Sequence, residues 1–159
     1  MYKIGDYVVY KKDVCKVGDI INKSDVLYYK LVPVCDSSLR IDIPVDNTNL
    51  LRDLIDKKTI DDLIKELSNI KVLKTTNNML ENNYKELLRE GSFVSLMTII
   101  KTAYLRNQER EKNNKKKSDR DNYYLDLAEK YLYTEFSVVL GMSFDDTRDY
   151  FINCMLERV

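Results

Sequence analysis

The sequence predicts an α+β fold in two parts, a small curled β-barrel over residues 1–56 and an all-helical domain of about five helices over residues 57–159. Two observations support this prediction. Segments rich in Val, Ile and Tyr alternate with turn-forming residues as far as Asn47, which is typical of short strands. Beyond Arg52 the apolar residues recur every three or four positions, which is the period of an amphipathic helix.

Four strands are expected in the first part, and Val, Ile and Tyr are frequent in each of them. They cover Tyr7–Tyr10, Val14–Ile21, Val26–Val34 and Leu39–Val45. Both prolines of the chain, Pro33 and Pro44, fall at strand ends, where a missing backbone donor is tolerated. Four or five strands of this length are too few for a large sandwich, so we expect a small barrel of the SH3 or Tudor type.

The helices of the second part are expected from their start and stop signals. Thr59 followed by Asp62 predicts a capping box at the start of the first helix. The second helix covers Met79–Arg89 and ends at Gly91. A third helix is marked by the apolar residues Phe93, Leu96, Met97, Ile100 and Ala103.

Serine residues mark the starts of the last two helices. Ser118 is expected to cap the fourth helix and Ser143 the fifth. The highly charged segment Arg106–Asp121 before the fourth helix predicts a frayed helix end and an exposed loop.

The charges balance overall but are unevenly distributed. The chain has 26 basic and 26 acidic residues, yet residues 57–120 hold 15 Lys/Arg against 9 Asp/Glu, and residues 121–159 hold 3 against 8. A basic middle attracts phosphates, while an acidic end opposes a uniform coating of nucleic acid. A solvated helical surface explains the same charges equally well.

The residue types argue against an enzyme and against a cofactor or metal. The chain has no histidine, no nucleotide-binding loop and no hydrolase or metalloprotease motif. The pairs Asp61-Asp62 and Asp145-Asp146 lie at helix starts, and adjacent helical residues diverge by about 100°, so neither pair converges on one point. An enzyme would also require a buried polar pocket with a perturbed carboxylate, which we do not expect.

Cysteine and hydropathy patterns predict a cytoplasmic protein. The cysteine count is three, without a CxxC motif, so we expect reduced, packed thiols rather than disulfides or a zinc site. No apolar run reaches the roughly 18 residues that a bilayer crossing requires, so no membrane partner is expected.

The twelve tyrosines allow two interpretations. Tyr28-Tyr29, Tyr123-Tyr124, Tyr131 and Tyr133 could stack on bases, or could be core residues with a solvated hydroxyl. The spacing favours the core. The run Lys115–Lys117 could bind phosphate through charge alone, or could be a solvated loop.

The order of several short motifs resembles a known family. The first part contains a Gly-Asp-x-Val-Val-Tyr run at Gly5–Tyr10, a Tyr-rich strand at Tyr28–Leu31, and an Ile-Pro-Val-Asp-Asn run at Ile43–Asn47 followed by Leu51-Arg52. The second part contains Leu87-Leu88 before Gly91, the segment Tyr104–Arg110, and a helix from Ser118 to Phe136. Together these residues resemble the CarD-type bacterial transcription regulators, whose N-terminal domain is shared with transcription-repair coupling factors.

The resemblance implies a two-part device. In the family, a Tudor-like domain docks on the RNA polymerase β subunit, and a helical domain contacts promoter DNA at the upstream edge of the transcription bubble. There an apolar side chain inserted into the minor groove, the wedge, stabilises the open complex. Because docking raises the local concentration, a weak affinity for DNA is sufficient.

The same resemblance suggests site residues. The expected polymerase contacts lie on an exposed edge strand able to pair with a partner, and they are Lys23, Arg40, Asp42 and Ile43. The expected DNA contacts are Met79 and Leu80 as the wedge, with Tyr84, Lys85, Arg89 and Arg106 near phosphates.

Three departures from the family pattern stand beside these expectations. The relatives use a tryptophan as the wedge, and this chain has none. Aligning the Tyr84-Lys85 pair with the family places the wedge position at Leu80, whereas counting back from Gly91 without a gap places it at Asn77. The second departure is the family's Pro-x-His-Gly turn, which is replaced by Lys11–Asp13 and predicts a shorter hairpin. The third is Asp42, which stands where some relatives carry a basic residue that helps to hold polymerase. Met79 and Leu80 could also simply pack between helices.

The expected function is therefore a monomeric cytoplasmic regulator, associated with the nucleoid through polymerase. The alternative is a protein-only adaptor with a Tudor-like domain that binds polymerase or another partner without touching DNA. The missing tryptophan favours the alternative.

Overall fold

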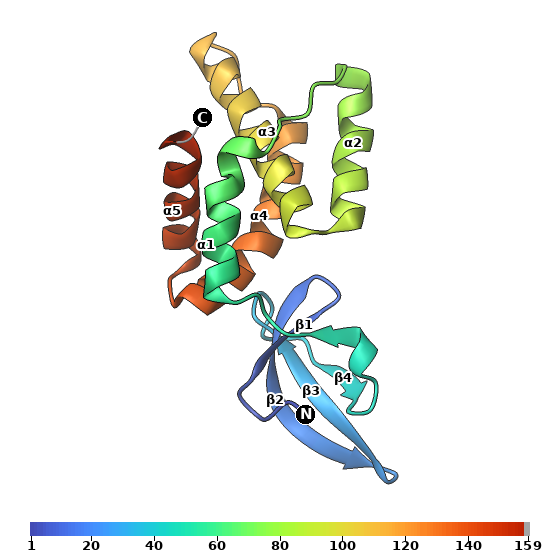
Figure 1. Cartoon of the computed structure of the whole chain (residues 1–159). Coiled ribbons are helices and arrows are strands. Elements are labelled where there is room, and N and C mark those ends of the chain that lie inside the picture. The colour runs from blue at the N-terminus through green and yellow to red at the C-terminus, as the bar shows by residue number, and fades with distance from the viewer. Residues whose placement is uncertain (158–159) are drawn as a thin grey trace. The chain divides into compact units, whose positions relative to one another are not determined.

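The structure, a computed structural model, describes residues 1–157, apart from the side chain of Thr48. The chain divides into two compact units, Met1–Ile55 and a second that begins at Asp56, beside a predicted boundary after residue 56. The first unit is a β-sheet and the second is helical, so the α+β class is confirmed (Figure 1).

The first unit is a five-stranded antiparallel sheet in the order β4-β3-β2-β1-β5. Its pairings join β1 to β2 and β5, and β3 to β2 and β4, so that β4 and β5 are the two edges. Within the described residues the sheet is open rather than closed into a barrel. The strands are β1 (Tyr7–Tyr10), β2 (Asp13–Lys23), β3 (Val26–Pro33), β4 (Ile41–Pro44) and β5 (Leu51–Arg52).

Two-residue turns set the register of the sheet. Lys11 and Lys12 connect β1 to β2, because Tyr10 lies opposite Asp13. Ser24 and Asp25 connect β2 to β3 with φ values of 52° and 67°, and positive φ at both central residues is typical of a type I′ hairpin turn.

One face of the sheet packs into a small apolar core. Alternate strand residues point to this face, as the two-residue period of a strand requires. The buried members are Val8, Cys15, Val17, Tyr29, Leu31 and Ile43.

The second unit is a bundle of five α-helices in the described residues. The long helices α3 and α4 pack against each other, α2 packs on α3 and α4, and α1 and α5 pack with α4 (Figure 1). The helices are α1 (Lys57–Lys65), α2 (Asn77–Glu90), α3 (Phe93–Lys112), α4 (Asp119–Leu140) and α5 (Phe144–Glu157), with a short 3₁₀ helix η2 (Glu66–Asn69) after α1.

Most of the predicted helix ends are confirmed. Gly91 ends α2 in the left-handed conformation with a φ of 66°. Ser118 accepts a hydrogen bond from the Asp121 amide at the start of α4, and Ser143 accepts one from the Asp146 amide at the start of α5.

Two predictions about helix ends were wrong. The first helix is capped by Asp56, whose carboxylate accepts a 2.7 Å hydrogen bond from the Thr59 amide, so Thr59 lies inside the helix. The helix end after Arg106 is not frayed, because α3 continues to Lys112, but the expected exposed loop is present at residues 113–117. Asn107 links the end of α3 to the start of α4. Its side-chain oxygen accepts a hydrogen bond from the Ser118 amide at 3.0 Å, and its side-chain amide donates to Asn122 Oδ1 at 2.8 Å.

Candidate functional site

Strand β4 presents a free edge at one end of the sheet (Figure 1). It pairs with β3 on one side, with Ile43 opposite Tyr29 and Asp42 opposite Lys30. An unpaired edge exposes backbone donors and acceptors that another strand can use.

The hydrogen-bond pattern identifies which backbone groups face outward. The Val45 amide donates to the Leu27 carbonyl at 2.9 Å, so this pair is a hydrogen-bonded one. Because such pairs alternate along an antiparallel ladder, Ile43 is bonded to β3 and Asp42 directs its N–H and C=O away from the sheet. Ile43 is 4% exposed and belongs to the core of the sheet. Neither its side chain nor its backbone groups face outward, contrary to the expectation that Ile43 contacts polymerase.

The predicted polymerase-binding side chains partly neutralise one another. Lys23 Nζ lies 2.6 Å from Asp42 Oδ2. This hydrogen bond, helped by the charges of Lys23 and Lys30, holds the pKa of the Asp42 carboxyl below its ordinary value. Arg40 donates to the carbonyls of Ser37 and Leu39, so its guanidinium is folded onto its own loop.

Helix α2 buries two of the predicted DNA contacts. Leu80 is 1% exposed and Tyr84 is 0% exposed, and both face the bundle. The burial of Leu80 contradicts its expected role as a wedge, because its side chain is already packed in the helical core. Met79, which is 50% exposed, is the apolar side chain that α2 offers to solvent.

Tyr84 and Arg106 meet at a buried carboxylate instead of at a phosphate-binding surface. The Tyr84 hydroxyl donates to Asp121 Oδ1 at 2.9 Å, and Arg106 Nε lies 3.1 Å from Asp121 Oδ2. Asp121 is 0% exposed. Burial, the hydrogen bond to Asp121 and its charge all raise the pKa of Tyr84. Arg106 also reaches the side chain of Asn77 at 3.3 Å, so this network ties α2, α3 and α4 together.

The exposed bases of α2 are paired with acids of the same helix. Lys85 lies 4.0 Å from Glu81, and Arg89 forms an ion pair with Glu86. The helix carries three glutamates against one lysine and one arginine, so its net charge is −1. From the helical period, Met79 and Lys85 also lie about 120° apart around the helix axis. The predicted wedge and bases therefore do not form one basic, apolar stripe.

Burial decides for most of these tyrosines between stacking on bases and packing in the core. Tyr29, Tyr124 and Tyr133 are core residues, as the spacing favours, whereas Tyr123 is 60% exposed. The Tyr124 hydroxyl donates to Glu81 at 2.9 Å, and burial together with this contact raises the pKa of Tyr124 to about 12.

Three buried polar residues have little signal in the sequence. Asp121 and Asn107 are 0% and 4% exposed, and both lie in the segment predicted to be frayed. Lys101 is 6% exposed on α3, among apolar residues that predicted a plain core helix. The position of Asp121 three residues after Ser118 was a signal, but it indicates a helix start rather than a network.

A perturbed carboxylate is present, contrary to expectation. Burial raises the pKa of Glu129 on α4 from 4.5 to about 7, with the charge of Arg148 on α5 opposing the shift and that of Asp126 adding to it. In the part of the chain that the structure describes, Glu129 does not line the cavities at Lys101, Tyr2, Tyr104 and Cys154. Because folding buries this carboxylate, its ionisation opposes folding.

Glu129→Gln is expected to stabilise the chain at pH 8 by roughly 1 to 2 kcal/mol and to change it little at pH 4. A pKa raised in the folded state means that folding favours the protonated form, so stability falls as the pH rises from 4.5 to 7. Urea unfolding at several pH values measures this. Glu109→Gln, on the exposed surface of α3, is the matched control. Identical pH profiles for the wild type and Glu129→Gln would contradict the assignment.

Within residues 1–157, no helix combines the length and the apolar character that a membrane crossing requires. In the same range, His, Cys, Asp and Glu side chains do not gather in groups of three that could hold a metal ion.

A comparison with models of protein families finds no match, and no curated protein matches the chain.

Proposed function

We propose that the chain is a CarD-like regulator that docks on the RNA polymerase β subunit through the free edge of β4. The observation that supports this best is the outward backbone N–H and C=O of Asp42 on an unpaired strand. The sheet need not close into a barrel for this role, because strand addition requires an open edge. The proposed function places the protein in the cytoplasm, on polymerase at the nucleoid.

The proposal includes a contact between the helical unit and promoter DNA, with Met79 as the wedge. Methionine is among the apolar residues that proteins insert between base steps, and the cost of unstacking is offset by contacts with the distorted duplex. Docking on polymerase compensates for the near-neutral surface of α2.

A second candidate function is a protein-only adaptor that docks through the same edge and does not contact DNA. The pairing of Lys85 with Glu81 and of Arg89 with Glu86 favours it, because each of these bases already has an acidic neighbour within α2. Neither candidate is an enzyme.

The lifetime of the polymerase–promoter open complex separates the two functions. The wild-type chain is expected to lengthen it, and Met79→Ala is expected to shorten that lifetime roughly threefold or more. Val94→Ala is the matched control, since Val94 is 52% exposed on α3. The measurement is the decay of heparin-resistant complexes on a linear promoter fragment.

Two outcomes decide between the candidates. If the chain binds polymerase but leaves the open-complex lifetime unchanged, the protein-only adaptor is correct. If the chain does not bind polymerase or its isolated β lobe, the CarD-like regulator is excluded, and the adaptor is left only with a partner other than polymerase. Leu80→Ala is not a useful probe of DNA contact, because a buried leucine truncation destabilises the bundle by about 2–5 kcal/mol.

A further inference from the structure

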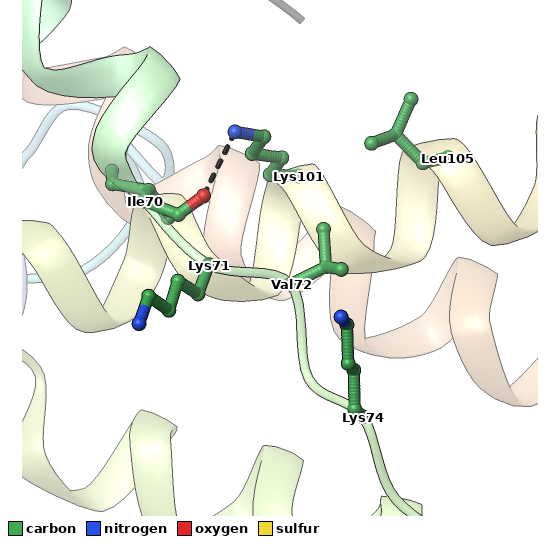
Figure 2. Close-up of a pocket in the computed structure, with 6 residues that line it drawn as sticks. All are labelled: Ile70, Lys71, Val72, Lys74, Lys101 and Leu105. Atoms are coloured by element: carbon green, nitrogen blue, oxygen red, sulfur yellow. Dashed lines mark hydrogen bonds between the residues drawn. The ribbon is translucent and has the colours of Figure 1, made fainter.

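A groove on the helical unit lies where the segment before α2 crosses α3 (Figure 2). Its volume is about 680 Å³, which falls within the range of small-molecule sites. The segment is fixed to α3, because the Leu73 amide donates to Thr102 Oγ1 at 3.0 Å. The lining residues are Ile70, Lys71, Val72, Lys74, Lys101 and Leu105.

Lys101 is a buried cation at this groove without a counter-ion. It is 6% exposed, and its ammonium donates to the carbonyls of Leu67 and Ile70 at 2.7 and 2.8 Å. An ammonium has three donors, so one remains. Among residues 1–157 no carboxylate pairs with it, and burial alone lowers the pKa of Lys101. A buried unpaired charge is costly, and an anion in the groove would relieve that cost.

Lys74 adds a second ammonium group to the groove, and three apolar side chains add an aliphatic surface. Figure 2 shows Lys74 extending toward Val72, while Lys71 turns away from Leu105. Lys74 has an exposed position and pairs with no carboxylate in the described part of the chain. Ile70, Val72 and Leu105 supply aliphatic surface beside these ammonium groups.

We propose that this groove binds a small organic anion with an aliphatic body. The acid group of the ligand lies at Lys101 and Lys74, and its body lies on Ile70, Val72 and Leu105. An ammonium is a point charge that does not require the planar, bidentate geometry of a guanidinium site, so carboxylate and phosphate heads both fit. This inference is independent of the proposed function, since it uses none of the β4 or α2 residues.

The test uses the full-length chain and three probes that separate charge from apolar area. Octanoate carries both features, octan-1-ol carries the chain alone, and acetate carries the charge alone. Titrations are followed by amide shifts in ¹H–¹⁵N NMR spectra. Octanoate is expected to saturate, with shifts at Val72, Lys74 and Leu105 and an affinity about tenfold above that of either other probe.

Variants locate the anion at the two lysines. Lys101→Met is expected to remove the advantage of octanoate over octan-1-ol, and Lys74→Ala is expected to weaken octanoate roughly threefold. If Lys101→Met fails to fold, Lys74→Ala still tests the proposal, because Lys74 is exposed and its substitution is not expected to affect folding. Lys130→Ala, on the exposed surface of α4, is the matched control and is expected to bind like the wild type.

Three results would overturn the proposal. One is equal binding of octanoate and octan-1-ol, which would indicate an apolar groove without an anion site. Another is an equal effect of Lys74→Ala and Lys130→Ala. The third is a glutamate-rich peptide that shifts the groove amides when octanoate does not, which would identify a protein partner instead.

Discussion

Asp121→Ala is expected to lower the free energy of unfolding by about 2–4 kcal/mol. The substitution leaves the buried Tyr84 hydroxyl without its 2.9 Å acceptor and Arg106 without its 3.1 Å partner. Arg106 keeps a third of its side chain exposed, so water replaces part of what it loses. Tyr84 is 0% exposed, so the cost of its unpaired hydroxyl is retained. Urea denaturation followed by circular dichroism measures the loss.

Two further variants isolate the carboxylate of Asp121. Asp121→Asn keeps an acceptor for Tyr84 but loses the charge, so we expect an intermediate loss. Asp119→Ala, in the same first turn but exposed, is expected to change stability by about 0.5 kcal/mol or less. The pKa of Tyr84 should also fall toward its ordinary value in Asp121→Ala, since Asp121 helps to raise it. An unchanged denaturation midpoint in Asp121→Ala would show that the network contributes nothing.

Asp42→Pro is expected to weaken binding to the polymerase β lobe at least about tenfold while the sheet stays folded. Proline removes the backbone N–H that Asp42 directs away from β3, so it deletes a donor to the partner without breaking a bond within the sheet. The preceding residue, Ile41, is already in extended strand conformation, as a residue before proline prefers. Titration calorimetry of the full-length chain with the β lobe measures the change.

Asp42→Ala separates the backbone of residue 42 from its side chain. It keeps the N–H but removes the ion pair with Lys23, which is solvent-exposed and therefore weak. We expect Asp42→Ala to bind within a few fold of the wild type. If both variants lose affinity equally, the side chain rather than the strand edge makes the contact. If Asp42→Pro binds normally, docking does not use β4.

The elements of the fold could be predicted from the sequence because their signals are local. The alternation of Tyr29 and Leu31 with half-buried neighbours, and the caps at Ser118 and Ser143, depend on residues a few positions apart. The openness of the sheet could not be predicted, because it depends on whether β4 and β5 meet. That pairing is a long-range contact without a local signal.

The candidate site could be predicted only in part, for the same reason. An edge strand at the expected polymerase contacts came from the resemblance, and the strand order places β4 at an edge. The burial of Leu80 and Tyr84 did not follow, because a family alignment assigns a residue to a position but not to a side of its helix. The Asp121 network joins residues up to 37 positions apart, so no local pattern could indicate it.

The attachment of α2 has a consequence for dynamics. Only Leu80 and Tyr84 of this helix are fully buried, and hydrogen bonds from Tyr84, Arg106, Arg120 and Tyr124 add polar attachments. The helix lies between the irregular residues 70–76 and the left-handed Gly91. Helices with so little apolar anchorage open locally at a lower free energy than the whole molecule unfolds. Such an opening uncovers Leu80 and frees Arg106 together. The free energy of this opening depends on the hydrogen bonds that Asp121 accepts from Tyr84 and Arg106. A ligand that binds the opened bundle more tightly than the closed one would shift this equilibrium toward opening.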